Sequence, residues 1–199
     1  MSSASRPADV TGDASDEKAE ARTISAAGEV ASASRSRRLL AYRWLWLMAA
    51  IAFGLDQGTK VWVNARLPLG SYGSNGIVVI PGFFNIVHVG NTGAAWSMFS
   101  GRSTVLAVLA AATLTAIFIW RHELGLRREI VQIFFGLLCG GTAGNLLDRL
   151  VHQHVVDFLD FHFGSYTYPT FNVADACICV GVIGYILWSL RHPSRPSEG

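Results

Sequence analysis

The sequence predicts an α-helical integral membrane protein with four transmembrane helices and a small β-sheet on the outer face. Two features of composition and one of patterning support this fold class. Of the 199 residues, 51% are hydrophobic and only 15% are charged, whereas soluble domains carry about 25% charged residues. Four apolar stretches also reach the roughly 17 to 25 residues that a helix needs to cross a bilayer.

The four predicted spans cover residues 40–63, 104–120, 130–147 and 173–190. The third span carries Gly136, Gly140 and Gly144 at four-residue spacing, a pattern of small residues that lets another helix approach closely. Residues 1–38 have no apolar periodicity and predict a disordered tail. We therefore expect a membrane domain over residues 39–191, followed by a short polar tail at 192–199.

The distribution of basic residues predicts the orientation of the spans. Arginines cluster before the first span, between the second and third, and after the fourth: Arg35, Arg37, Arg38, Arg43, Arg121, Arg127, Arg128, Arg191 and Arg195. Cytoplasmic loops carry the excess of Lys and Arg in membrane proteins. Both termini are therefore expected in the cytoplasm, and segments 64–103 and 150–171 are expected to face outward.

The long connection over residues 64–103 predicts a small sheet. Residues 77–80 and 83–89 are rich in β-branched and aromatic side chains, and Pro81-Gly82 separates them, which is typical of short strands joined by a turn. Segment 150–171 is expected to be a loop.

Several classes of function and site are not expected. A net charge of +2, with arginines flanking apolar segments, does not favour a nucleic-acid partner. Cys139, Cys177 and Cys179 lie within apolar helices without metal-ligand spacing and are expected to be buried as small apolar side chains. The histidines are scattered, so we expect neither a metal site nor a cofactor.

Polar residues gather at the outer ends of three predicted helices. Asp56 and Lys60 are four residues apart and form a possible ion pair. On the third helix one stripe is polar or small, and the fourth helix begins with a polar turn. These residues are Gly141, Asn145, Asp148, Arg149, Asn172 and Asp175. This asymmetry predicts a polar pocket at the outer boundary between membrane and water, although ion pairing or an interhelical network with a purely structural role would produce the same pattern.

Two carboxylates, Asp157 and Asp175, lie in almost wholly apolar surroundings. An ionisable group at the edge of a membrane segment is costly and is usually functional. Two neighbouring acids can share a proton, which suits them to activate water against an amide bond. The hypothesis is an intramembrane aspartyl hydrolase. Asp160 is the competing candidate, but we expect it to be an exposed loop carboxylate.

Two other classes of protein compete with the hydrolase. In a small ion- or proton-coupled transporter the acids and Lys60 would form a relay, but the polar groups lie at one depth. In a non-enzymatic assembly factor the pocket would be a docking site. Cleavage of a peptide bond by the purified protein would exclude both.

Five motifs resemble the lipoprotein signal peptidases, the type II signal peptidases of bacteria. In chain order they lie at residues 56–60 (Asp-Gln-x-Thr-Lys), 91–95 (Asn-Thr-Gly-Ala-Ala), 144–149 (Gly-Asn-Leu-Leu-Asp-Arg), 155–158 (Val-Val-Asp-Phe) and 171–175 (Phe-Asn-x-Ala-Asp). The resemblance covers about residues 40 to 190. The departure at position 96 is slight: Trp96 is aromatic, as is usual there, but the aromatic residue at this position is often Phe.

The resemblance implies four transmembrane helices with a small β-cradle on the outer face, over about residues 64–103. It implies an aspartic endopeptidase of the bacterial cytoplasmic membrane that removes the signal peptide from diacylglyceryl-modified prolipoproteins, just before the lipidated cysteine. We expect the protein to be a monomer in contact with membrane lipid. Asp157 and Asp175 match the catalytic pair. The residues that match its substrate-orienting or supporting positions are Asn91, Gly93, Asn145, Arg149, Asn172, Ala174, Asp56, Lys60, Gly141 and Asp148.

Overall fold

The computed structural model describes residues 41–72, 75–94 and 98–192. The elements in chain order are α2 (Arg43–Arg66), β1 (Ile77–Ile80), β2 (Phe84–Asn91), α3 (Ser103–Ile119), α4 (Glu129–His152), β3 (Val155–Phe163), β4 (Tyr166–Thr167) and α5 (Val173–Arg191). The four helices agree with the four predicted apolar stretches to within a few residues, except that α4 extends five residues further. The predicted tails at 1–38 and 192–199 lie almost entirely outside the described residues.

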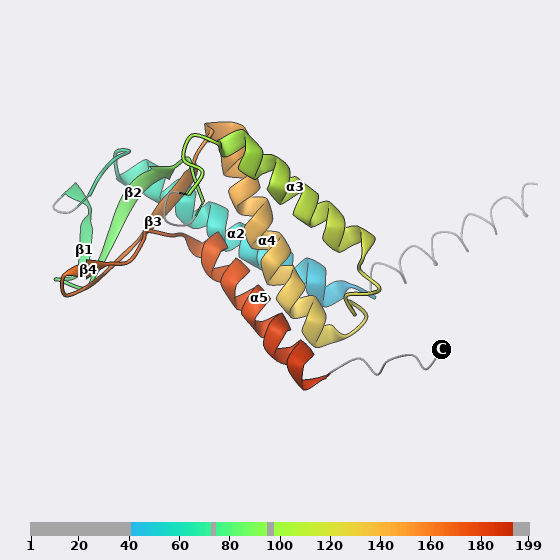
Figure 1. The fold of residues 1–199 in the computed structure, drawn as a ribbon. Helices are drawn as coiled ribbons and strands as arrows, with labels where there is room; N and C mark the ends of the chain where they lie inside the picture. The colour runs from blue at the N-terminus through green and yellow to red at the C-terminus, as the bar shows by residue number, and fades with distance from the viewer. Residues whose placement is uncertain (1–40, 73–74, 95–97, 193–199) are drawn as a thin grey trace, which may run out of the picture. The chain divides into compact units, whose positions relative to one another are not determined.

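Helix α4 lies at the centre of the helical part and packs against α2, α3 and α5 (Figure 1). The predicted close approach at its glycines is confirmed. A Cβ atom at Gly136 would lie 2.7 Å from the backbone oxygen of Leu45, and one at Gly140 would lie 2.8 Å from the Cβ of Ala52. These contacts bring α2 and α4 together backbone to backbone.

The outward faces of the helices are apolar. Large side chains such as Leu55 on α2, Val108 on α3 and Leu190 on α5 are exposed. By length and composition, α4 and α5 are apolar enough to cross a membrane, while α3 is a shorter apolar helix of 17 residues. Helix α2 contains the charged residues Asp56 and Lys60, both buried. Such surfaces on a helical bundle fit a lipid environment.

The sheet is larger than the sequence predicted. It has four antiparallel strands in the order β1-β2-β3-β4. Strands β1 and β2 lie within the predicted region 64–103, but β3 and β4 come from segment 150–171, which was wrongly expected to be a loop. The acids and His162 interrupt the apolar alternation of β3, and pairing with β2 stabilises the strand in spite of them.

A β-bulge lies in β2 next to Asp157 of β3. The register changes from Ile86 opposite Leu159 to Val89 opposite Asp157, so two residues of β2 face the single residue Phe158. Such bulges re-aim side chains and bend the strand. Phe158 is buried against Val63 of α2, and this contact anchors the sheet to the helices beside Asp157.

The cysteine prediction is partly wrong. Cys139 and Cys177 are only half-buried, and Cys179 is exposed on the surface of α5. Helix α5 packs mainly on α4 and less on α2, and apolar side chains such as Ile183 and Leu187 stay exposed on its surface.

Candidate active site

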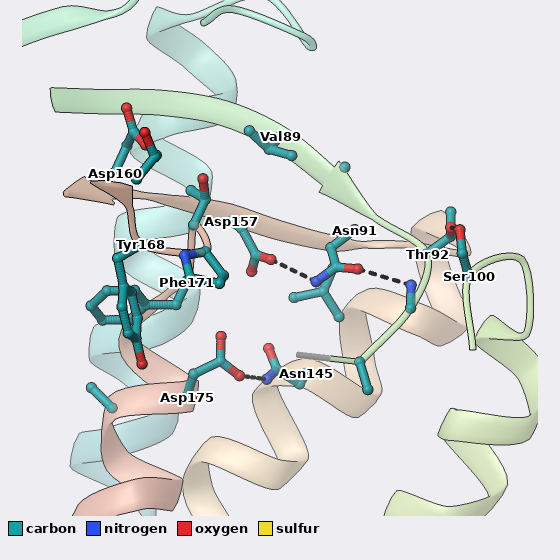
Figure 2. Close-up of a pocket in the computed structure, with 18 of the residues that line it drawn as sticks. Val89, Asn91, Thr92, Ser100, Asn145, Asp157, Asp160, Tyr168, Phe171 and Asp175 are labelled. Carbon is teal, nitrogen blue, oxygen red and sulfur yellow. Dashed lines mark hydrogen bonds between the residues drawn. The ribbon is translucent and has the colours of Figure 1, made fainter. Parts of the chain in front are cut away.

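The two predicted acids meet across one cavity, although they come from different elements. Asp157 lies on β3 and Asp175 in the first turn of α5, and both line a cavity of about 1120 Å³. Figure 2 shows the two carboxylates facing the same space, with Asn91 and Asn145 beside them. The cavity walls are the sheet, the turn at residues 91–94, the C-terminal end of α4 and the first turns of α5.

Asn172 contacts both acids. Its side-chain amide donates to Asp157 Oδ1 at 2.7 Å. As the N-cap of α5 it forms a capping box with Asp175: its side-chain oxygen accepts from the Asp175 backbone N–H at 3.0 Å, and its own N–H donates to Asp175 Oδ2 at 3.1 Å. A capping box satisfies two helix-end donors reciprocally, and here it also fixes one acid relative to the other.

A turn after β2 holds the other oxygen of Asp157. Asn91 donates to Asp157 Oδ2 at 2.9 Å and accepts from the Gly93 N–H at 2.8 Å. Arg149 of α4 donates to the Gly93 carbonyl at 3.0 Å and to the Asn145 carbonyl at 3.2 Å. The guanidinium of Arg149 therefore holds the turn against α4, and Asn91 at the start of this turn orients Asp157.

Lys60 is the centre of a buried charge network behind the cavity. Its Nζ lies 2.8 Å from Asp56 Oδ2 and 2.9 Å from Asp148 Oδ2, and all three side chains are at most 4% exposed. The predicted pair of Asp56 and Lys60 is confirmed, with Asp148 as a third member. These residues are absent from the cavity lining over the described part of the chain, which supports a structural role.

Asn145 joins this network to the acids. Its oxygen accepts from Lys60 at 2.8 Å, and its amide nitrogen donates to Asp175 Oδ1 at 2.8 Å. Asp56 also accepts from the Ala174 backbone N–H at 3.0 Å. The start of α5 can approach α4 here because position 141 is glycine: a Cβ there would lie 2.5 Å from the Ala174 carbonyl oxygen.

The environment of Asp157 favours a protonated carboxyl. Burial, and secondarily the negative charge of Asp175, raises the pKa of Asp157 to about 7. The hydrogen bonds from Asn91 and Asn172 and the charge of Lys60 act in the opposite direction. A carboxyl that is half protonated near neutral pH, beside a second carboxylate, can exchange a proton with a substrate.

The structure corrects one prediction in this region and adds two residues. Asp160 is a buried residue of β3, only 3% exposed, and it receives a hydrogen bond from His162 Nε2 at 2.7 Å; pairing with β2 buries it. His88, expected only among scattered histidines, is buried and lies 2.8 Å from the Leu67 carbonyl. Gln57, within a quoted motif but given no role, donates to Asp56, Gly144 and Asp148.

All twelve residues predicted for the site lie in or directly behind this cavity. The arrangement offers two acids, amide donors on both, and a cavity that opens beside apolar helices. Such a pair can hold and activate a water molecule against a carbonyl group, as the shared-proton dyads of aspartic proteases do.

Comparisons with known proteins agree with this chemistry. The family model described as Signal peptidase (SPase) II matches residues 48–191. The lipoprotein signal peptidase of Aeromonas hydrophila subsp. hydrophila is 40% identical over 157 residues, which cover 77% of this chain and 91% of the relative. That of Oleidesulfovibrio alaskensis is 40% identical over 153 residues, which cover 74% and 95%.

A solved structure shares the fold. A bacterial membrane enzyme determined by the in meso method at 2.3 Å resolution has a TM-score of 0.67 and 32% identity, covering 77% of this chain and 91% of that one. With relatives of this identity matched along most of their length, the transporter and docking-factor alternatives are set aside. The chain therefore belongs to the signal peptidase II family, and it is a membrane enzyme with the aspartic lipoprotein signal peptidase activity of that family.

Proposed function

We propose that Asp157 and Asp175 are the catalytic pair, and that they remove the signal peptide from diacylglyceryl-modified prolipoproteins by cutting just before the lipidated cysteine. The observation that carries the assignment is the joint attachment of both acids to Asn172 within one cavity. Over the described part of the chain, Asp160 is the remaining carboxylate in the cavity lining.

The reaction needs one proton on the pair. The ionised carboxyl accepts a proton from a water molecule as the water oxygen attacks the scissile carbonyl carbon. The protonated carboxyl donates its proton to the carbonyl oxygen, and collapse of the tetrahedral intermediate returns a proton to the leaving amine. The raised pKa of Asp157, about 7, keeps a proton on the pair near neutral pH, and the two groups titrate as one unit. Such proton transfers contribute about 10²–10⁴-fold.

The amide groups around the acids would orient the pair and the substrate backbone. Asn91, Asn145 and Asn172 leave each carboxylate two fixed donors, and positioning of this kind is a major part of catalysis. Gly93, Arg149 and Ala174 shape the turn and the helix start. The polar set Asp56, Lys60, Gly141 and Asp148 would hold α2, α4 and α5 in the working arrangement.

The membrane arrangement follows from the same proposal. We infer four transmembrane helices, both termini in the cytoplasm and the cavity near the outer leaflet of the bacterial cytoplasmic membrane. The arginine distribution and the gathering of the sheet and cavity at one end of the helices support this orientation. The enzyme is proposed to work as a monomer, with bilayer lipid retaining the acylated substrate beside α5.

The test is cleavage of a diacylglyceryl-modified precursor by purified protein in detergent. We expect a single cut before the modified cysteine by the natural enzyme and none by Asp157→Asn or Asp175→Asn. Cleavage of an unmodified precursor at the same rate would contradict the proposed substrate class. Full activity of either Asn variant would contradict the proposed pair.

A further inference from the structure

One end of the cavity carries a polar cluster that the proposed reaction does not use. Asp160 accepts hydrogen bonds at Oδ2 from Asn85 Nδ2, at 3.2 Å, and from His162 Nε2, at 2.7 Å. His162 Nδ1 lies 3.1 Å from Thr167 Oγ1. Side chains from β2, β3 and β4 thus hold one buried carboxylate in a fixed position, which costs free energy unless the charge is compensated.

The cluster forms part of the cavity wall. Asp160, His162 and Thr167 line the same cavity as the acid pair, together with Tyr72. In Figure 2 Asp157 lies between Asp160 and Asp175. Burial, and after it the negative charges of Asp160 and Asp157, raises the pKa of the Tyr72 hydroxyl. The charge of Asp160 therefore acts on groups inside the cavity.

The cavity also differs in polarity from one side of the acid pair to the other. On the α5 side, beyond Asp175, its wall consists of Ala176, Ile178 and Cys179, while the sheet side carries Asp160, His162 and Thr167 beside Val89, Gly90 and Val155. A precursor has an apolar signal segment and a mature segment destined for water. Matching polarity places the signal segment along α5 and the start of the mature segment along the sheet.

The spacing along β3 indicates which substrate residue meets Asp160. Asp160 is three residues beyond Asp157 on this strand; in a regular strand such residues point to opposite faces, but both of these residues line the cavity. A strand advances about 3.3 Å per residue, so the two positions are about 10 Å apart. An extended peptide beside the strand covers this distance with about three residues.

We propose that Asp160, held by Asn85 and His162, is a specificity-determining residue that binds a cationic side chain about three residues after the cleaved bond, on the mature side of the substrate. This inference rests on the proposed function, because it takes Asp157 and Asp175 as the point of cleavage. Asp160 contributes no proton to the reaction; its carboxylate attracts the Lys or Arg side chain.

The experiment compares three synthetic diacylglyceryl-modified precursor peptides that differ only at the third residue after the cleaved bond, which is Lys, Gln or Glu. The readout is kcat/KM for each peptide with purified full-length enzyme. We expect the order Lys, Gln, Glu for the natural enzyme, and a Lys-to-Glu ratio at least about fivefold smaller for Asp160→Asn, because this carboxylate is only 3% exposed and removing one partner of its ion pair costs at least as much as at an exposed pair. Glu123→Gln, which removes an exposed carboxylate in the α3–α4 connection, is the matched control and should keep the ratio.

His162→Gln distinguishes a specificity role from a merely structural one. It removes the imidazole but keeps the Asp160 carboxylate, so the Lys-to-Glu ratio should be kept or should rise. A fall of this ratio with His162→Gln, or an equal slowing of all three peptides by Asp160→Asn, would overturn the proposal. If Asp160→Asn does not fold, the natural enzyme decides: its Lys preference should shrink as salt is raised, and no preference at low salt refutes the inference.

Failure of the proposed function would look different. If Asp157→Asn or Asp175→Asn still cleaved the Gln peptide at the natural rate, the point of cleavage would be misplaced and both proposals would fall. If those variants were inactive while Asp160→Asn left the ratio unchanged, only the specificity of Asp160 would be wrong.

Discussion

Asn172 donates a 2.7 Å hydrogen bond to Asp157 while it caps helix α5, whose first turn contains Asp175. The residue that starts α5 is thus the residue that fixes the distance between the two acids. Asn172 is completely buried, so its side chain has no alternative partner in water. Formation of the helix end and assembly of the acid pair are therefore one structural event.

Replacement of Asn172 separates its two roles. A serine side chain can still cap the helix, but it is too short to reach Asp157 as well. Asn172→Ser should keep most of the stability and lose about tenfold or more in cleavage. Asn172→Ala should lose a similar amount of activity and, in addition, about 1 kcal/mol of stability. Thermal unfolding in detergent, measured beside precursor cleavage, checks both; equal stability of the Ser and Ala variants would argue against the capping role.

The same change from Asp to Asn should lower cleavage far more at Asp157 and Asp175 than at the neighbouring Asp160. Asp157→Asn and Asp175→Asn keep the side-chain shape but cannot move the proton, so cleavage should fall by at least about 10³-fold with the fold intact. Asp160→Asn should lower cleavage far less, because Asp160 bonds to His162 rather than to the pair. Precursor cleavage by equal amounts of purified protein measures the difference. An essential Asp160 and a dispensable Asp157 would reverse the assignment.

The helical part of the fold was predictable because each helix must present a long apolar surface. The boundaries of α3 differ from the predicted span by one residue at each end, and those of α5 by one residue at the C-terminal end only. The glycines of α4 also predicted the close approach of another helix, which the structure shows to be α2. The positive-φ residue Gln153, which ends α4 and turns the chain into β3, carries no such signal, since glutamine is an ordinary helix residue.

The sheet and the cavity wall were harder to predict. The long-range pairing of β3 with β2 joins residues more than 60 positions apart, such as Asn91 opposite Val155, and local sequence does not encode that partner. The acidic residues of β3 also make this segment resemble a polar loop in the sequence. Most residues predicted for the site stood out because polar side chains within apolar segments are rare, whereas Asn91, Gly93 and Ala174 were named through the family resemblance. Asp160 was misjudged, since its burial depends on the strand pairing.

The pH dependence of cleavage should show the titration of Asp157. Its pKa of about 7 means that the pair loses its shared proton as the pH rises through this value. The value of kcat/KM should therefore decline above about pH 7, and it should also decline in acid, where both carboxyls are protonated. In Asn91→Leu the alkaline decline should move to higher pH, because the hydrogen bond from Asn91 lowers the pKa of Asp157. A profile that is flat from neutral to alkaline pH would contradict this view.

The charge network of Lys60 should be worth far more than a surface ion pair. Lys60→Met leaves Asp56 and Asp148 buried without their cation, which costs about 3–5 kcal/mol. Arg43→Met on the same helix removes the exposed Arg43–Glu129 pair, whose side chains are 60% and 62% exposed, and should cost less than about 1 kcal/mol. Thermal unfolding in detergent compares the two variants; similar losses would show that burial does not strengthen the network.

Topology gives a test that does not depend on enzyme activity. The Arg127 region, between α3 and α4, and the turn at Gly164, between β3 and β4, lie at opposite ends of the adjoining helices. The proposed orientation puts Arg127 in the cytoplasm and Gly164 outside, since basic connections stay inside. Single cysteines at the two positions, in a background with Cys139, Cys177 and Cys179 replaced by Ala, should differ in labelling of intact spheroplasts by an impermeant thiol reagent. We expect labelling at position 164 and protection at position 127 until the membrane is opened. The reverse pattern would put the cavity on the cytoplasmic side, away from exported precursors, and would refute the proposed site of action.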